Sequence, residues 1–111
     1  MLHPALSAGR TAVITGGASG IGLAAARRFA SLGMKLVLAD LAQAALDKAV
    51  SELPGAIVVT VPADVSKMDD VQRLKERAYA EYGEIAVLMN NATGRFTAPQ
   101  FPRRALPAIA T

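Results

Sequence analysis

The sequence predicts an α/β fold in which a parallel sheet is covered by helices on both faces. Short apolar or β-branched runs alternate with longer segments of helical periodicity, in the order β-α-β-α-β-α-β. Since crossovers between parallel strands are right-handed, this alternation folds into a doubly wound sheet. A glycine-rich turn at residues 16–22 separates the first strand from the first helix. We expect about four strands in the order 3-2-1-4, three helices, and a ligand crevice between strands one and four.

The predicted elements follow one another along the first 90 residues. The strands are expected at residues 11–14, 34–40, 56–61 and 85–89, and the helices at residues 21–32, 42–53 and 67–82. The second strand is near-continuously apolar, which is typical of a strand buried on both faces. Ser66 is the expected N-cap of the third helix, because Asp69 and Asp70 follow it and acidic side chains suit a helix N-terminus.

We expect the chain to divide into a flexible N-terminal arm at residues 1–9, a partial α/β domain at residues 10–94 and an irregular tail at residues 95–111. The tail holds three of the six prolines and the three arginines that account for the net charge of +3. Basic residues are therefore not clustered on the predicted domain, and a nucleic-acid partner is disfavoured. Because strand four has no predicted neighbour on one side, its open edge favours self-association or a homo-oligomer.

Composition excludes several classes of site. The chain contains no cysteine, so disulfides and thiolate metal sites are excluded, and its single histidine, His3, lies in the predicted arm. We expect no metal site. No apolar run approaches the length of a membrane span, and residues 1–10 lack the pattern of a signal peptide. We therefore expect no membrane partner and a cytoplasmic location.

The glycine-rich turn has the chemistry of a phosphate cradle. Gly16 can turn the chain out of the strand, Gly20 lets a diphosphate approach the backbone, and Gly22 lets the helix start lie against the strand. The helix N-terminus adds unpaired N–H groups and a partial positive charge. No Lys-Ser or Lys-Thr pair follows Gly20, which argues against a nucleoside-triphosphate P-loop.

Asp40 provides a second element of a nucleotide site. It ends the second predicted strand, 18 residues after Gly22. A carboxylate there can accept hydrogen bonds from both ribose hydroxyls and would repel a 2′-phosphate, so NAD is favoured over NADP. Leu41, not a basic residue, follows it. The alternative is that Asp40 caps the second helix, and the two roles are compatible.

Two further motifs follow the glycine-rich turn and Asp40: Asp64-Val65 after the third predicted strand and Asn90-Asn91-Ala92 after the fourth. Together the four motifs resemble the short-chain dehydrogenase/reductase family over roughly residues 10–92. Thr15-Gly16-Gly17-Ala18-Ser19-Gly20-Ile21-Gly22 is similar to its Thr-Gly-x-x-x-Gly-x-Gly motif, Asp64-Val65 to its Asp-Val pair, and Asn90-Asn91-Ala92 to its Asn-Asn-Ala-Gly motif. The resemblance implies a Rossmann-type fold, an NAD cofactor and an adenine contact from the Asp64 carboxylate. The cofactor-binding residues implied are Gly16, Ser19, Gly20, Ile21, Gly22, Asp40, Leu41, Asp64, Val65, Asn91 and Ala92.

The catalytic residues of that family find no match in this chain. The family uses a serine and a Tyr-x-x-x-Lys motif, but Tyr79 is followed four residues on by Gly83, and Tyr82 by Ala86. We interpret both tyrosines as packing or surface residues. The chain is expected to be the N-terminal part of an NAD-dependent alcohol/carbonyl oxidoreductase, truncated or frame-shifted after about Thr93 and inactive alone. The alternative is a non-catalytic dinucleotide-binding module, or a partner subunit completed by another chain.

Overall fold

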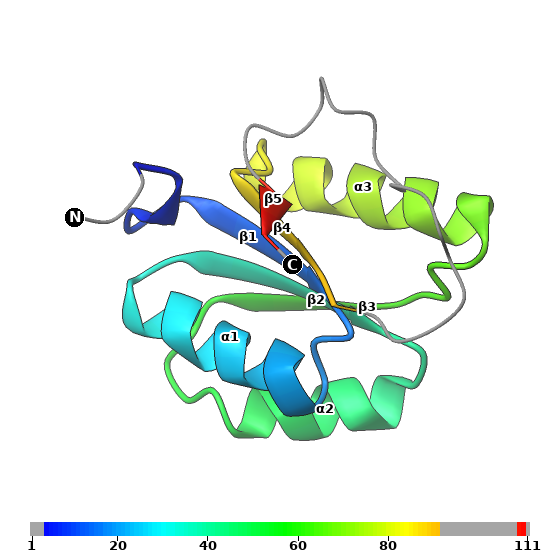
Figure 1. The fold of residues 1–111 in the computed structure, drawn as a ribbon, viewed down its shortest axis with the longest axis horizontal. Coiled ribbons are helices and arrows are strands. Elements are labelled where there is room, and N and C mark those ends of the chain that lie inside the picture. Colours follow the sequence, from blue (N-terminus) through cyan, green and yellow to red (C-terminus); the bar gives the residue numbers. More distant parts are fainter. Residues whose placement is uncertain (1–3, 92–108, 111) are drawn as a thin grey trace.

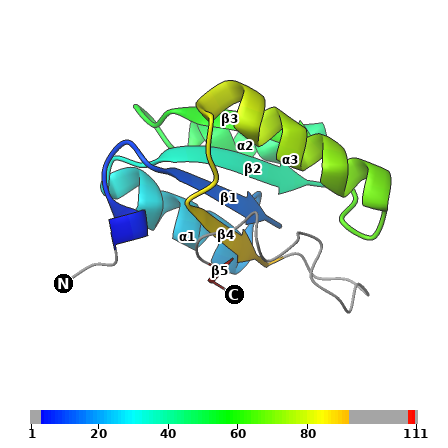
Figure 2. The same cartoon turned by 90° about the horizontal axis from the view of Figure 1, so that it is seen from above.

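The computed structural model describes residues 4–91 and 109–110, and it centres on one parallel sheet. The strands are β1 (Thr11–Thr15), β2 (Lys35–Asp40), β3 (Val58–Pro62), β4 (Val87–Asn90) and β5 (Ile109–Ala110). Their order is β3-β2-β1-β4-β5, which Figure 2 shows from the top of the view to the bottom. The predicted order of the first four strands is confirmed.

Helices cover both faces of this sheet (Figure 1). They are the 3-10 helix η1 (Pro4–Leu6) and the α-helices α1 (Gly20–Ser31), α2 (Gln43–Ser51) and α3 (Met68–Tyr82). The first two α-helices lie on one face and α3 lies on the other, so the predicted doubly wound architecture with three α-helices is confirmed. No helix in the described part of the chain combines the length and apolar character needed to cross a bilayer.

The hydrophobic core consists of two layers, one on each side of the sheet. Successive strand residues alternate between them: Ile14 packs in the layer under α1 and α2, and Val13 in the layer under α3. Leu46 of α2 and Leu74 of α3 are both fully buried in their respective layers. Burial on both faces explains why β1 and β2 are apolar without alternation.

The edge of β4 differs from the expectation. In the predicted irregular tail, β5 pairs in parallel with β4, placing Ile109 opposite Leu88 and Ala110 opposite Met89. The prediction that this edge is open was therefore wrong over those two residues. A two-residue strand is too short to show any periodicity, so the pattern could not reveal it. Arg95, Arg103 and Arg104 lie outside the described residues.

Part of the expected N-terminal arm packs against the domain. Ala5 of η1 is 4% exposed and belongs to the core layer under α1 and α2. The N–H of Gly9 donates to the carbonyl of Gly33 over 2.9 Å, which ties this segment to the turn after α1. Ala5 and Gly9 of the expected arm thus contact the α/β layers, and the boundary at residue 10 stays a prediction.

Candidate functional site

The glycine-rich turn joins β1 to α1 at the carboxyl edge of the sheet. Gly16 and Gly20 adopt φ values of +68° and +58°, in the left-handed region that favours glycine. A Cβ on Gly22 would lie 2.0 Å from the Gly16 carbonyl oxygen and 3.0 Å from Nδ2 of Asn91. Only a residue without a side chain allows the start of α1 to approach the turn this closely.

The outer surface of the turn is open. A Cβ on Gly20 would meet no atom of the protein within 4 Å, and the neighbouring Ser19 and Ile21 are exposed. Ser19 is the N-cap of α1, but its side chain makes no capping hydrogen bond. Within the described residues, the first N–H groups of α1, at the positive end of the helix dipole, thus receive no acceptor from the Ser19 side chain. This is the environment in which a ligand phosphate finds donors.

The Asp40 carboxylate lies against this turn. Its Oδ2 accepts a hydrogen bond from the N–H of Ala18 at 3.1 Å, and its Oδ1 accepts one from the N–H of Leu41 at 2.8 Å. The N-cap of α2 is Ala42, with no side-chain capping bond. The alternative that Asp40 caps this helix was therefore wrong. Leu41, beside the carboxylate, is 70% exposed.

Asp64 lies at the same edge, in the loop after β3. Pro62 is the cross-strand partner of Asp40, and the N–H of Ala63 donates to the Asp40 carbonyl at 2.8 Å. The Asp64 carboxylate receives two hydrogen bonds on Oδ1 from Ser66, one from its hydroxyl at 2.6 Å and one from its N–H at 2.9 Å. These bonds favour the charged form, so they lower the pKa of Asp64 below its ordinary value.

Ser66 consequently does not cap α3. The helix begins at Met68 with Lys67 as its N-cap residue, and the Ser66 donors are directed to Asp64 instead. The physical cause is that the Ser66 hydroxyl donates to the Asp64 carboxylate two residues earlier, a charge-assisted bond that holds Ser66 in the loop before the helix. Val65, between these residues, packs against the core layer under α3.

Thr15 joins the glycine-rich turn to the end of β4. Its buried Oγ1 donates to Oδ1 of Asn90 at 3.0 Å and accepts from the N–H of Asn91 at 3.1 Å. Together with the close approach of Asn91 to Gly22, these bonds place the predicted asparagine motif directly beside the turn. Ala92, the remaining predicted site residue, lies outside the described residues.

The structure thus brings most predicted site residues to one edge of the sheet. Within the turn, Ala18 contacts Asp40 and Gly22 lies close to Asn91. Asp64 comes after β3, the strand that pairs with β2 and its last residue, Asp40. Three supporting residues were not predicted as part of the site: Thr15, Ala18 and Ser66. Thr15 opens the recognised motif and could have been found there, whereas the Ala18 contact depends on tertiary packing that no local pattern encodes.

Both tyrosines occupy structural positions on α3. They pack against the core layer under that helix, and the Tyr82 hydroxyl donates to the Leu36 carbonyl at 3.2 Å. Burial, with a smaller contribution from the neighbouring Glu81 charge, raises the pKa of Tyr82. A tyrosine that transfers protons needs a lowered pKa, so this environment opposes such a role.

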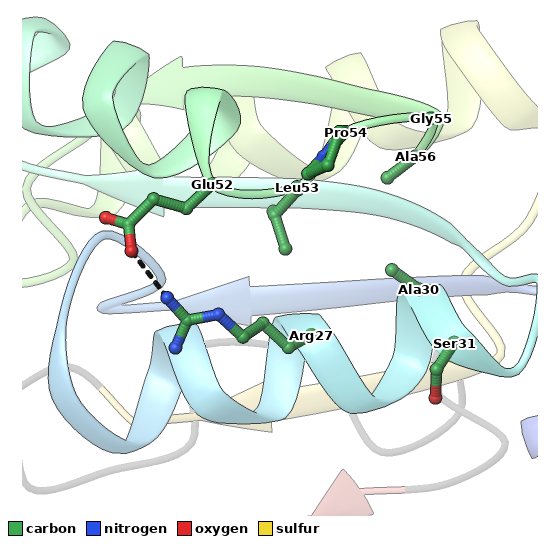
Figure 3. A pocket seen from close by; sticks show the side chains of 8 residues that line it. All are labelled: Arg27, Ala30, Ser31, Glu52, Leu53, Pro54, Gly55 and Ala56. Carbon is green, nitrogen blue, oxygen red and sulfur yellow. Dashed lines mark hydrogen bonds and ion pairs between the residues drawn. The ribbon is translucent and has the colours of Figure 1, made fainter.

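A separate hollow of about 320 Å³ lies away from this edge, between the C-terminal half of α1 and the loop after α2 (Figure 3). An ion pair at 2.5 Å between Arg27 and Glu52 crosses it. Its lining is Arg27, Ala30, Ser31, Glu52, Leu53, Pro54, Gly55 and Ala56. The paired charges neutralise one another, and the hollow contains none of the predicted site residues. Within residues 4–91 no three side chains of metal-binding type gather together.

A doubly wound parallel sheet with a glycine-rich turn before its first helix defines the Rossmann-type α/β proteins. Residues 10–106 match the family model of the short chain dehydrogenases. The chain therefore belongs to the short chain dehydrogenase family, whose members are oxidoreductases.

Individual relatives agree with this assignment. The 1-deoxy-11-beta-hydroxypentalenate dehydrogenase of Streptomyces arenae is 48% identical over 85 residues, which are 75% of this chain and 30% of the relative. A short chain dehydrogenase/reductase from Burkholderia phymatum, solved in complex with NAD, is 48% identical with a TM-score of 0.74, covering 77% of this chain and 31% of that one.

A third relative is the 3-ketoacyl-(acyl-carrier-protein) reductase of Brucella melitensis, solved with NADH. It is 39% identical with a TM-score of 0.72, covering 77% of this chain and 34% of that one. The chain thus spans about a third of the length of each of these three relatives.

Proposed function

We propose that this chain binds NAD(H) at the carboxyl edge of its sheet, as the cofactor-binding portion of an alcohol/carbonyl oxidoreductase. The observation that carries the proposal is the junction of Asp40 with the glycine-rich turn, where the carboxylate lies one hydrogen bond from Ala18. Two solved relatives of the family were obtained with NAD or NADH. Their sequence identity supports the same cofactor class here.

The residues present fit such a cofactor. The open face of Gly20 and the first N–H groups of α1 would receive the diphosphate, and Asp40 would accept hydrogen bonds from the adenosine ribose. Asp64 would accept one from the adenine amino group. Bound NAD would supply the hydride acceptor of the reaction. Ser19, Ile21, Leu41, Val65, Asn91 and Ala92 would complete the contacts, as the family resemblance implies.

NAD is proposed over NADP because of the charge at Asp40. A 2′-phosphate at the ribose would be repelled by that carboxylate, and the following residue, Leu41, provides no compensating positive charge. The proposal does not include turnover by this chain alone, since neither tyrosine has a lysine four residues later. Dehydrogenase turnover by the purified chain would contradict the expectation that it is inactive alone. A non-catalytic dinucleotide-binding module, the alternative function, would also bind NAD without turnover. The cytoplasmic location stays a prediction.

Calorimetric titration with NAD tests the proposal. We expect the wild-type chain to bind NAD and Gly20→Val to abolish binding, because the added methyl groups would occupy the space of the diphosphate. Gly83→Val is the matched control: Gly83 also has a positive φ, +76°, and open space at its Cβ position, but it follows α3. Backbone strain is thus similar in both variants, and only Gly20→Val should lose the cofactor. Equal affinities of the wild type and Gly20→Val would contradict the proposed site.

A further inference from the structure

The loop after β3 holds Asp64 at several points. The N–H of Asp64 donates to Oδ2 of Asp70 at 2.8 Å, and the carbonyl of Asp64 accepts from the N–H of Lys67 at 2.9 Å. Asp70 also pairs with Arg73 at 3.5 Å, and the Arg73 guanidinium donates to the Pro62 carbonyl at 2.8 Å. The N-cap residue and the first two turns of α3 therefore fix the backbone of this loop on both sides of Asp64.

Ser66 fixes the side chain of Asp64 in turn. Its hydroxyl and its N–H both donate to Oδ1 of the carboxylate. Among the described residues, no hydrogen bond to Oδ2 of Asp64 is found. Since two donors from one residue define the orientation of Oδ1, they also define where Oδ2 lies, and that oxygen is left as an acceptor for a ligand donor.

From this arrangement we infer that Ser66 is a positioning residue for adenine recognition: it orients the Asp64 carboxylate so that Oδ2 is presented, in advance, to the exocyclic amino group of the base. The inference rests on the proposed function and deepens it. Asp64 is well placed for this role because its loop is hydrogen-bonded to Asp40, the proposed ribose acceptor, through Ala63. Ser66 acts through Asp64 and needs no contact with the cofactor itself.

The chemistry of the base provides a selective probe. Adenine offers an amino group, a donor, where hypoxanthine has a carbonyl oxygen, an acceptor. A fixed carboxylate oxygen binds the first and repels the second, whereas a carboxylate free to rotate can turn away from either. The preference for NAD over nicotinamide hypoxanthine dinucleotide therefore measures how firmly Asp64 is oriented, and a merely structural role of Ser66 would lower both affinities together.

The experiment compares both dinucleotides by calorimetry with the wild type, Ser66→Ala and Ser66→Thr. We expect the wild type to prefer NAD roughly tenfold, as one charge-assisted hydrogen bond allows. Ser66→Ala should lose most of that preference, and Ser66→Thr, which keeps the hydroxyl, should retain it. Ser66 is exposed, so both side chains fit. Ser51→Ala is the matched control, because the hydroxyl of Ser51 donates to the Lys48 carbonyl within α2, away from Asp64 in the sequence.

A readout that needs no cofactor accompanies the titration. Loss of the hydroxyl should raise the Asp64 pKa toward its ordinary value of 3.8, observable in the carboxyl resonance of the protein. Retention of the full NAD preference by Ser66→Ala, or no preference in the wild type, would overturn this inference while leaving the proposed function intact. Failure of the wild type to bind NAD would overturn both.

Discussion

Asp40 performs two electrostatic tasks with one side chain. Its Oδ2 holds the N–H of Ala18 and so fixes the glycine-rich turn, while the carboxylate as a whole places a negative charge beside the proposed ribose position. A buried or half-buried acceptor in contact with a backbone donor contributes about 1 kcal/mol to stability. The charge contributes to specificity instead, because it opposes a phosphate on the ribose.

Substitution separates these tasks. Asp40→Asn keeps an oxygen acceptor for Ala18 but loses the charge, so we expect NAD affinity to fall roughly tenfold and the discrimination against NADP to shrink, with little change in stability. Asp40→Ala should in addition destabilise the fold by about 1 kcal/mol. Calorimetry and urea denaturation measure the two effects. Asp47→Asn, which removes an exposed carboxylate from α2, is the control. Unchanged NADP discrimination in Asp40→Asn would argue against the specificity role.

At the scale of elements, each helix is held to the sheet by a few buried apolar residues. Leu74 is the fully buried residue near the middle of α3, whereas Met68 at the start of the same helix is 65% exposed. Packing of an apolar stripe, and not intrinsic propensity, is what stabilises a short helix of this kind. The two positions on one helix therefore contribute very differently to stability.

We expect Leu74→Ala to destabilise the fold by about 2–5 kcal/mol, through lost burial and the cavity that remains. Met68→Ala should change stability by no more than about 0.5 kcal/mol. The first loss is a large fraction of the total stability of a small domain, so Leu74→Ala should unfold at a much lower urea concentration than the wild type. Urea denaturation followed by circular dichroism measures both. Similar losses for the two variants would show that α3 is not held through Leu74.

The order of these elements could be predicted from the sequence because it depends on local patterns. Buried strands and amphipathic helices carry their periodicity in a few consecutive residues, and the glycines mark the turns. The start of α3 could not be predicted correctly, since Ser66 has the same local signal whether its hydroxyl caps the helix or binds Asp64. The contacts of Asp40 with Ala18 and of Thr15 with the asparagines likewise join residues that only the folded sheet brings together.

For the whole molecule, the edges of the sheet determine what the domain can associate with. β3 forms one edge, and β5 covers part of β4 at the other. An uncovered strand presents unpaired N–H and C=O groups to other chains. The two-residue ladder between β4 and β5 is only a small barrier to pairing of this edge with another chain. The self-association expected from the sequence stays a prediction.

Removing the β5 ladder tests the role of that edge. Proline lacks the N–H of a ladder donor, so Ile109→Pro/Ala110→Pro should release β5 and expose the outer edge of β4 at Leu88 and Met89, which stay paired with β1 on the other side. We expect a higher average mass than that of the wild type in size-exclusion chromatography with light scattering, increasing with protein concentration. Ala8→Pro is the control, because it introduces proline at an exposed residue far from β4 in the sequence. Identical masses for wild type and double variant would show that β5 does not control association.

The side-chain contacts that join β1 to β4 affect the order in which the chain folds. Arg10 and Thr11 bind Glu84 at one end of this strand pair, and Thr15 binds Asn90 and Asn91 at the other. These contacts span 73 to 76 residues, whereas β1 and β2 pair across a much shorter connection. Closing the longer loop costs more entropy, so we expect the β1–β4 seam to form after the β1-β2-β3 layer. The glycine-rich turn meets Asn91 at that seam, and the proposed cofactor edge would thus be completed only in the last step of folding.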